Sequence, residues 1–303
     1  MQVFSGIFEL MENLKVSIVI PTYNRKNELR KLLDALNSED YPFRNFEVIV
    51  VDDGSSDGTG EFIESYASHI NLVTIVHKEN MGSAASRNDG VRTAVNEIVL
   101  FLDDDLVPSR GIIRNHIEHH SKSNCAVIGN IKYRETFSTR WVSRYLSTRG
   151  THKIKPDERI PFKCFWTSNT SIRKEHLLKV GLFDEQFKGA GGEDTEIAYR
   201  LEKVGIQFVF ADNALCYHKP VSLSELIKKQ ESFAKNALPL LAEKDEAFRR
   251  IFRLDLMKNP FVRFALSKVV YFPIYCLAGI MNLFYLPPFV IDYLLLRKRY
   301  NTK

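Results

Sequence analysis

Three consecutive carboxylates, Asp103, Asp104 and Asp105, come directly after an apolar segment at 98–102. The segment has the length and the β-branched and aromatic content of a buried strand, so the carboxylates stand at its carboxyl end. Adjacent unpaired carboxylates repel each other and are costly to bury. A hard divalent cation would relieve this repulsion and could also bind a diphosphate. The alternative is an acidic turn that caps the next helix.

A second acidic pair, Glu193 and Asp194, follows a run of glycine and alanine at 189–192. Apolar residues at helical spacing after the pair predict a helix that ends at Gly205. Carboxylates at a helix N-terminus are stabilised by the helix dipole, so simple capping is one interpretation. A cap requires only one carboxylate and no glycine run, so the pair is also a candidate for chemistry.

Strands and helices alternate regularly up to the three aspartates. Strands are expected at 16–20, 46–51, 72–76 and 97–102, and helices at Leu29–Leu36, Phe62–Tyr66 and 83–95. Asn24 or Asn27 is expected to cap the first helix. The alternation is typical of an α/β fold with a mostly parallel sheet and helices on both faces. Ligands bind beyond the carboxyl ends of such strands, where Tyr23, Asp53 and the three aspartates fall.

Several other kinds of site lack their sequence signals. No G-x-G-x-x-G run follows the first strand and no G-x-x-x-x-G-K-[ST] run occurs, which disfavours a dinucleotide cofactor and a phosphate-loop ATPase. The four cysteines form no C-x-x-C pair, as expected for reduced thiols in the cytosol without a zinc site. Residues 1–15 contain Glu9 and Glu12 and no uninterrupted apolar core, so we expect no secretory signal there.

Four motifs occur in the order and spacing of a known family. They are VSIVIPTYNR at 16–25, VVDDGSSDGT at 50–59, GSAASRNDG at 82–90 and LDDD at 102–105. Together they resemble the nucleotide-sugar domain of family 2 glycosyltransferases, over roughly the first 215 residues. The resemblance implies the GT-A fold, a nucleotide-diphosphate sugar donor and inversion at the anomeric carbon. The expected domain, 1–218, then has a donor half at 14–107 and an acceptor half at 108–218.

The resemblance also implies roles in the donor site. Tyr23 would stack on the nucleotide base, and Asp53 would accept a hydrogen bond from a base N–H. Asp105 would bind Mg²⁺ or Mn²⁺, and either Asp103 or Asp104 would contact the ribose. Arg87 contacts the donor in one interpretation and pairs with an aspartate at the surface in the other. The expected nucleotide-sugar-binding residues are Pro21, Thr22, Tyr23, Arg25, Asp53, Gly82, Arg87, Asp103 and Asp104, and the expected metal ligands are Asp105, Asp103 and His218.

On the acceptor side, members of the family carry a Glu-Asp pair after an Asn-containing strand, as 164–171 and Glu193–Asp194 do here. The Asp is the general base in that family, so the resemblance assigns catalysis to Asp194, supported by Glu193. A base assists attack by a sugar hydroxyl, whereas an ionised lipid phosphate needs none. We therefore expect transfer from a UDP-sugar, uridine being the commonest base in relatives, to a hydroxyl of a saccharide or glycolipid in cell-surface glycan synthesis.

The segment after the three aspartates predicts a helix that starts at Pro108-Ser109. Its three histidines, His116, His119 and His120, are a metal site in one interpretation. We interpret them as solvated helix positions rather than as a metal site.

The rest of the acceptor half predicts ordinary elements around a polar segment. A strand is expected at 126–133, and the polar segment 134–163 is interpreted as an acceptor-facing or disordered loop. A helix is expected to end at Gly181. A strand at 207–210 precedes His218, which is a metal ligand in one interpretation and a structural histidine in the other.

The C-terminal region 219–303 differs in charge from the rest of the chain. It contains 15 Lys or Arg and 7 Asp or Glu, whereas the remainder has a small acidic excess. Residues 269–291 contain no charge, but prolines at 273, 287 and 288 interrupt them. One full span would place basic clusters on both sides, against the positive-inside rule. We therefore expect amphipathic helices and interfacial contact with the cytoplasmic face of a membrane, with a helix pair packed on the catalytic domain as the alternative.

Parts of the sequence also suit other functions. The apolar C-terminal region also suits a polyprenyl-phosphate glycosyltransferase, and a catalytically inactive membrane-bound scaffold is the non-enzymatic alternative. The intact set of aspartates argues against the scaffold. A sugar-nucleotidyltransferase is disfavoured because no Gly-rich, Arg-containing loop follows the first strand. The charge distribution favours a membrane surface over nucleic acid as a partner.

Overall fold

A computed structural model describes residues 14–148, 160–189, 191–282 and 285–300, apart from the side chain of Met257. The prediction about the N-terminal residues falls almost wholly outside this range. The chain divides into two units. The first is formed by the described residues of 1–132, 150–188 and 193–218, and the second by those of 133–149, 189–192 and 219–303.

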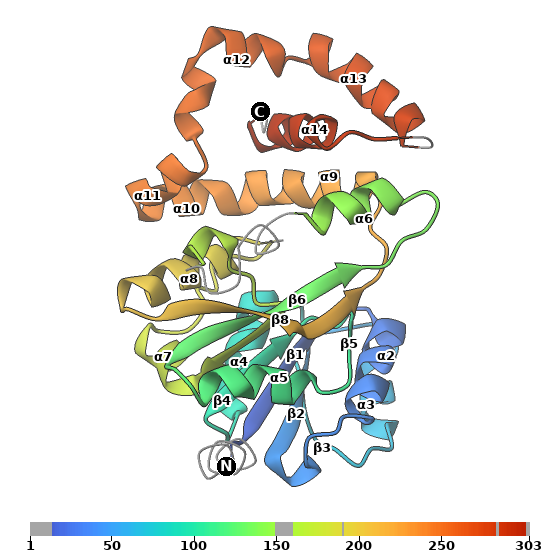
Figure 1. Ribbon diagram of the computed structural model, residues 1–303, viewed down its shortest axis with the longest axis vertical. Helices are drawn as coiled ribbons and strands as arrows, with labels where there is room; N and C mark the ends of the chain where they lie inside the picture. The colour runs from blue at the N-terminus through green and yellow to red at the C-terminus, as the bar shows by residue number, and fades with distance from the viewer. Residues whose placement is uncertain (1–13, 149–159, 190, 283–284, 301–303) are drawn as a thin grey trace, which may run out of the picture. The chain divides into compact units, whose positions relative to one another are not determined.

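The first unit contains the predicted strands and helices and also a short strand at 106–108 that was not predicted, so the helix expected from Pro108-Ser109 begins at Ile112 (Figure 1). Its strands are β1 (Val16–Thr22), β2 (Phe46–Asp52), β3 (Asn71–Val76), β4 (Ile98–Leu102), β5 (Leu106–Pro108), β6 (Cys125–Tyr133, whose last residue enters the second unit), β7 (Asn169–Arg173) and β8 (Gln207–His218). Its helices are α2 (Lys26–Leu36), α3 (Thr59–Ser65), α4 (Ser83–Thr93), α5 (Ile112–His120), α7 (Lys174–Lys179) and α8 (Glu193–Lys203), with short 3₁₀ turns η1 (Phe43–Asn45) and η3 (Phe162–Cys164).

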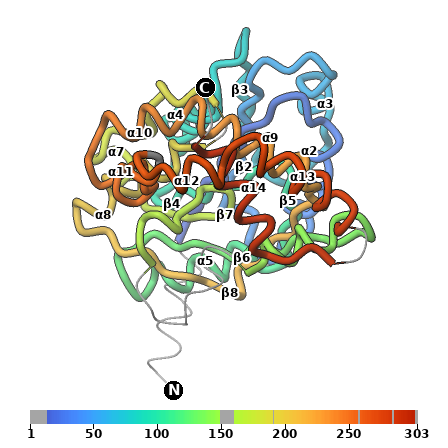
Figure 2. The backbone as a smooth tube through the Cα atoms, turned by 90° about the horizontal axis from the view of Figure 1, so that it is seen from above, coloured from blue at the N-terminus to red at the C-terminus, as the bar shows by residue number. Residues whose placement is uncertain are grey.

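The strands form one eight-stranded mixed sheet in the order β3-β2-β1-β4-β7-β6-β8-β5. In Figure 2, β3 and β8 lie toward opposite sides of the view, with β4 and β7 between them. The pairs β3-β2, β2-β1 and β1-β4 are parallel, whereas β4-β7, β7-β6 and β8-β5 are antiparallel. The expected parallel arrangement therefore holds for the strands up to the three aspartates, and the later strands add an antiparallel half.

The core of this unit lies on the central strands. Every residue of β2 and of β4 is buried, as expected for apolar strands that are covered on both faces. Helix α4 packs against β1 and β2, and α5 packs along β8. Helix α2 buries Leu29, Leu32, Leu33 and Leu36 on one face, which confirms its predicted periodicity.

The predicted cap of α2 is wrong. Arg25 occupies the N-cap position, and no side chain there makes a capping hydrogen bond. Asn24 adopts a left-handed backbone conformation (φ 53°) and turns to the loop that follows β2. Its Oδ1 accepts from the Ser56 N–H at 2.8 Å, and its own N–H donates to Ser55 Oγ at 2.8 Å. Asn24 therefore joins two loops at the carboxyl edge of the sheet instead of capping the helix.

Two of the three histidines on α5 are also not solvated as predicted. His116 and His120 are buried, and only His119 is half-buried. His116 contacts Ser171 Oγ and Asn169 Oδ1, both at 2.9 Å, and His120 Nε2 contacts the same Ser171 oxygen at 2.8 Å. The physical reason is that β7 offers polar partners to the buried face of the helix, which makes these residues part of a polar network in the core.

Strand β8 is much longer than predicted. It continues to His218, and its last residues pair with β5 so that His218 stands opposite Leu106. The histidine is therefore the end of a strand, next to the residue that follows Asp105. The helix predicted to end at Gly181 is confirmed as α7, with Gly181 in the left-handed conformation just beyond it.

The second unit is helical. Its helices are α6 (Arg140–Leu146), α9 (Leu223–Ser232), α10 (Leu238–Lys244), α11 (Glu246–Ile251), α12 (Pro260–Ala265), α13 (Lys268–Met281) and α14 (Pro288–Tyr300), with a π-helical segment η4 (Phe233–Ala237) and a 3₁₀ turn η5 (Leu254–Lys258). Figure 1 shows α9, η4 and α10 following one another along one line, with α14 beside α9. Within the described residues, no helix has the length and apolar character needed to cross a membrane.

The apolar core of the second unit joins segments that are far apart in the sequence. Val142 and Tyr145 of α6 are buried with Ile227 of α9 and with Ile291 and Leu294 of α14. The interpretation of 134–163 as a loop is therefore wrong for α6, which is too short to show a clear period. Residues 149–159 of that segment lie outside the described residues.

Candidate active site

Sequence-predicted site residues meet at the carboxyl ends of β1, β2 and β4. The parallel register places Thr22 opposite Asp52, and the Asp53 N–H donates to the Thr22 carbonyl at 2.9 Å. The Asp103 N–H donates to the carbonyl of Ser168, just before β7, at 3.0 Å. These backbone hydrogen bonds fix the loops that carry the candidate side chains.

Asp104 is held inside the protein. Its Oδ2 accepts from Thr22 Oγ1 at 2.8 Å, and its Oδ1 accepts from Arg25 Nη1 at 2.9 Å. Burial raises the pKa of Asp104 to about 7, although the Arg25 charge opposes the shift. Asp103 is different, because about a third of its side chain is exposed. Of the two candidates for a ribose contact, Asp103 has the more exposed side chain, and the contact itself stays a prediction.

Asp105 and His218 form the candidate metal site. His218 Nε2 lies 3.4 Å from Asp105 Oδ2, and Arg25 Nη1 contacts the same oxygen at 2.6 Å. Two ligands that bind one Mg²⁺ or Mn²⁺ at right angles stand about 3 Å apart, so a carboxylate and an imidazole at this separation fit such an ion. Within the described residues, no group of three or more His, Cys, Asp or Glu side chains is arranged to hold a metal. The two residues would therefore need oxygen ligands from a donor diphosphate or from water.

Arg87 links the two acidic clusters. It is 5% exposed, so the interpretation as a surface arginine is wrong. Its Nη2 donates to Asp103 Oδ1 at 3.0 Å, and its Nη1 donates to Glu193 Oε1 at 3.0 Å. The same Nη1 lies 3.9 Å from Asp194 Oδ1. One buried guanidinium therefore balances the charge of carboxylates from the end of β4 and from the start of α8.

Glu193 and Asp194 open α8, as predicted, behind Gly191 and Gly192, which both have positive φ angles. Asp194 Oδ1 accepts from Thr167 Oγ1 at 2.5 Å. Burial and the neighbouring Glu193 charge raise the pKa of Asp194 to about 7, whereas Arg87 and Thr167 act in the opposite direction. A carboxylate with this pKa is suited to accept a proton near neutral pH.

Asp53 is engaged by its own protein. The N–H groups of Met81 and Gly82 donate to its two oxygens at 2.8 and 2.9 Å, and His77 Nδ1 lies 2.8 Å from Oδ1. Gly82 makes this contact with a φ of 97°, a conformation that favours glycine. The hydrogen bond from a nucleotide base to Asp53 would share the carboxylate with these donors, and that role stays a prediction.

The remaining predicted donor residues lie on the same edge. Pro21 and Thr22 end β1, and Tyr23 follows with 46% of its surface exposed, as a stacking residue requires. Three further residues of the site were missed: His77, Ser83, which donates to Glu193 Oε1 at 3.0 Å, and Thr167. His77 comes directly after β3, so the expectation that ligands bind beyond the carboxyl ends of parallel strands could have identified it. Ser83 and Thr167 had no such signal, because their contacts depend on how α8 packs.

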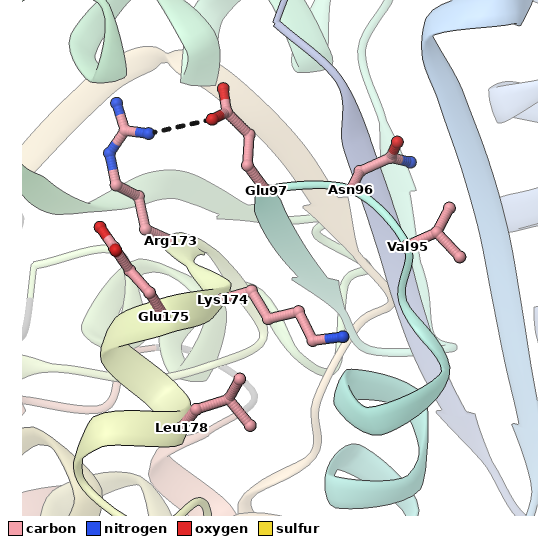
Figure 3. A pocket seen from close by; sticks show the side chains of 7 residues that line it. All are labelled: Val95, Asn96, Glu97, Arg173, Lys174, Glu175 and Leu178. Atoms are coloured by element: carbon pink, nitrogen blue, oxygen red, sulfur yellow. Dashed lines mark hydrogen bonds and ion pairs between the residues drawn. The ribbon is translucent and has the colours of Figure 1, made fainter.

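A cavity of about 390 Å³ lies at the opposite end of β4, and Figure 3 shows the residues that line it. Arg173 Nη1 lies 3.4 Å from Glu97 Oε2, and Lys174 Nζ donates to the Ala94 carbonyl at 2.5 Å just beyond α4. A cation near a helix C-terminus stabilises the helix. These contacts explain the charged residues as structural, and none of the predicted site residues lies there.

This chain is similar to known proteins. The model of the family described as Glycosyl transferase family 2 matches residues 17–185. Glycosyltransferase AglE of Haloferax volcanii is 30% identical over 244 residues, which covers 80% of this chain and 79% of that protein. The chondroitin synthase of Pasteurella multocida is 30% identical over 274 residues, but the matched part covers 79% of this chain and only 28% of that protein.

A solved structure agrees on the fold. The mannosyltransferase PcManGT of Pyrobaculum calidifontis, in complex with GDP-Man and Mn²⁺, is similar with a TM-score of 0.66 at 20% identity, over 93% of this chain and 85% of that chain. This likeness confirms the predicted GT-A fold. Because the family model covers more than half of the sequence, the chain belongs to glycosyl transferase family 2.

Proposed function

We propose that this protein is an inverting glycosyltransferase that moves a sugar from a nucleotide-diphosphate sugar, a UDP-sugar in our expectation, to a hydroxyl of a saccharide or glycolipid. The observation that carries the proposal is the position of Arg87, which bonds Asp103 on the donor side and Glu193 on the acceptor side. A single guanidinium spans only a few ångströms, so both substrates can meet beside it.

On the donor side, we assign the base to the exposed ring of Tyr23 and the ribose to Asp103. Asp104 serves as a positioning residue, because Thr22 and Arg25 already engage both of its oxygens. Asp105 and His218 are the residues that would hold Mg²⁺ or Mn²⁺. Such an ion, when bound, stabilises negative charge on the departing diphosphate.

On the acceptor side, Asp194 is the proposed general base. The acceptor oxygen forms a bond to the anomeric carbon while the bond from that carbon to the diphosphate oxygen breaks. The hydroxyl proton passes to Asp194 Oδ2, since Thr167 occupies Oδ1. Glu193, fixed by Ser83 and Arg87, keeps the pKa of Asp194 high through its charge.

The raised pKa of Asp194 supports a hydroxyl acceptor. An alcohol must lose its proton as it attacks, and a base with a pKa of about 7 can take that proton at neutral pH. A polyprenyl phosphate is already ionised and would gain nothing from this base. Competition between lipid phosphates and oligosaccharides for the same donor decides between the two acceptor classes.

We place the reaction at the cytoplasmic face of a membrane, in the synthesis of a cell-surface glycan. The free cysteines and the basic C-terminal region support this location. The similarity to a chondroitin synthase, named for a polysaccharide product, supports the acceptor class.

The test begins with a thermal-shift screen of UDP-, GDP- and dTDP-sugars with Mn²⁺, followed by transfer assays with Asp194→Asn. We expect the variant to bind the donor as the wild type does and to lose transfer by about 10²–10⁴-fold. Asp212→Asn, an exposed position on β8, is the matched control and should retain full activity. Unchanged transfer in Asp194→Asn would exclude this residue as the base. Absence of nucleotide binding in calorimetry would instead support an inactive scaffold.

A further inference from the structure

The helices α12 and α13 expose large apolar side chains that a helix normally buries. Phe261 is 83% exposed and Val269 is 78% exposed, and Phe264, Phe272 and Ile280 are also exposed. We call these five residues the α12–α13 apolar face. Helix α12 has no buried residue at all. Large exposed apolar side chains gathered on two neighbouring helices indicate a site of interaction.

The part of the apolar face that belongs to α13 lies on one side of that helix, and the other side packs against the rest of the unit. Tyr271, Ile274 and Met281 pack against the apolar core of the second unit, and Ala278 is buried in it. Val269, Phe272 and Ile280 follow at helical spacing on the remaining side. The exposed residues of α13 therefore lie on the side of the helix that does not pack against the core of the unit.

Basic residues lie close to this face in the sequence. Between 249 and 268 the chain carries six basic side chains, all exposed, and a single carboxylate, that of Asp255. The basic residues are Arg249, Arg250, Arg253, Lys258, Arg263 and Lys268. In the sequence, Arg263 lies between Phe261 and Phe264 of α12, and Lys268 lies between Phe264 and Phe272. Exposed aromatic and aliphatic side chains flanked by Lys and Arg are typical of a helix that lies in the headgroup region of an anionic bilayer.

We propose that the α12–α13 apolar face docks on the surface of an anionic lipid bilayer, with the phenylalanines inserted among the acyl chains and the basic side chains at the lipid phosphates. A second copy of the chain is a poor occupant, because the same six cations would face each other across the interface. This inference does not depend on the proposed sugar transfer, since lipid binding is measured without a donor.

The full chain is tested by flotation with vesicles of phosphatidylcholine alone and with vesicles that also contain about one third phosphatidylglycerol. We expect at least tenfold more protein on the anionic vesicles, and loss of that excess in 0.5 M salt. The variant Phe261→Ser/Phe264→Ser/Phe272→Ser should lower binding to the anionic vesicles at least tenfold. Arg263→Glu/Lys268→Glu should lower it similarly at low salt.

Val95→Ser is the matched control, because Val95 is 79% exposed but lies in the first unit. It should float as the wild type does. Thermal unfolding and donor binding are measured on every variant, so a folding defect or a failed donor assignment is separated from lost lipid binding. Wild-type protein that stays with the soluble fraction, or a triple variant that floats normally, would overturn the proposal. So would light scattering that shows a lipid-free dimer dissociated by the triple substitution.

Discussion

His218 Nε2 lies 3.4 Å from Asp105 Oδ2, because the pairing of β5 with β8 sets His218 opposite Leu106. Residues 109–206 lie between the two strands in the sequence, yet their pairing brings a carboxylate and an imidazole close enough for the proposed cation to contact both. This pairing makes the metal assignment testable independently of the general base.

His218→Ala removes the imidazole and should lower the affinity for Mn²⁺ in the presence of a nucleotide diphosphate by roughly tenfold or more. The expected result is a higher Mn²⁺ concentration at half-maximal activity and a weaker calorimetric signal. His69→Ala, at an exposed position of the first unit, is the control. If both variants titrate with Mn²⁺ as the wild type does, His218 is a structural histidine.

Arg87→Met should destabilise the protein as well as stop transfer. The substitution leaves the carboxylates of Asp103, Glu193 and Asp194 without their buried cation, and breaking a buried ion pair in this way costs about 3–5 kcal/mol. The free energy of unfolding from urea titrations measures the effect. Arg92→Met, on the same helix but 54% exposed, should change that free energy by less than about 0.5 kcal/mol. Equal effects of the two substitutions would contradict the bridging role of Arg87.

The sequence predicted the places of the acidic residues, after a strand and at the start of a helix, better than it predicted the contacts between these elements. The apolar run of β4 and the glycine run before α8 are local signals, so Asp103–Asp105 and Glu193–Asp194 were placed correctly at a strand end and a helix start. The contact from Arg87 to Glu193 joins residues from different elements, and no local pattern encodes it.

The histidines of α5 show a signal that was present but given too little weight. His116 and His120 share the helical stripe of Ile112, Ile113 and Ile117, all of which are buried. The period therefore placed them on the core face. Their hydrogen-bond partners, Asn169 and Ser171, belong to β7, which follows β6 in the chain. These residues reach α5 only because β7 joins the antiparallel half of the sheet, and no local pattern predicts that.

The pH dependence of transfer should report Asp194. Its pKa of about 7 predicts that kcat/KM rises as the pH increases through neutrality, because only the ionised carboxylate accepts a proton. Thr167→Val removes a hydrogen bond that favours the ionised form, so the midpoint should move to higher pH. The pKa of Asp104 is also about 7, but Thr167 is not among the residues that raise or lower it. A shift of the midpoint in Thr167→Val therefore reports the pKa of Asp194. If Thr167→Val leaves the midpoint unchanged, the ionisation of Asp194 does not set the pH dependence of kcat/KM.

Acid should destabilise the first unit through its buried histidines. Burial lowers the pKa of His120 to about 3 and that of His116 to about 4, whereas unfolded histidine titrates near pH 6.5. Below pH 6.5 the unfolded chain therefore binds protons that the folded chain does not, and stability falls as the pH decreases toward 4. At pH 5 the lowered pKa of His120 alone decreases the free energy of unfolding by about 2 kcal/mol.

The raised pKa values of Asp104 and Asp194 act in the opposite direction, since the folded chain binds their protons at a higher pH than the unfolded chain does. Asp104 and Asp194 are present in both wild type and His120→Leu, so their effect cancels when the two proteins are compared. The difference in the free energy of unfolding, measured with urea at pH 7.5 and again at pH 5, should shift by about 2 kcal/mol in favour of the variant. Ser171 keeps its contact with His116 in the variant, so the core network is only partly lost. A difference that is the same at both pH values would mean that His120 is protonated in the folded protein, which its burial against β7 opposes.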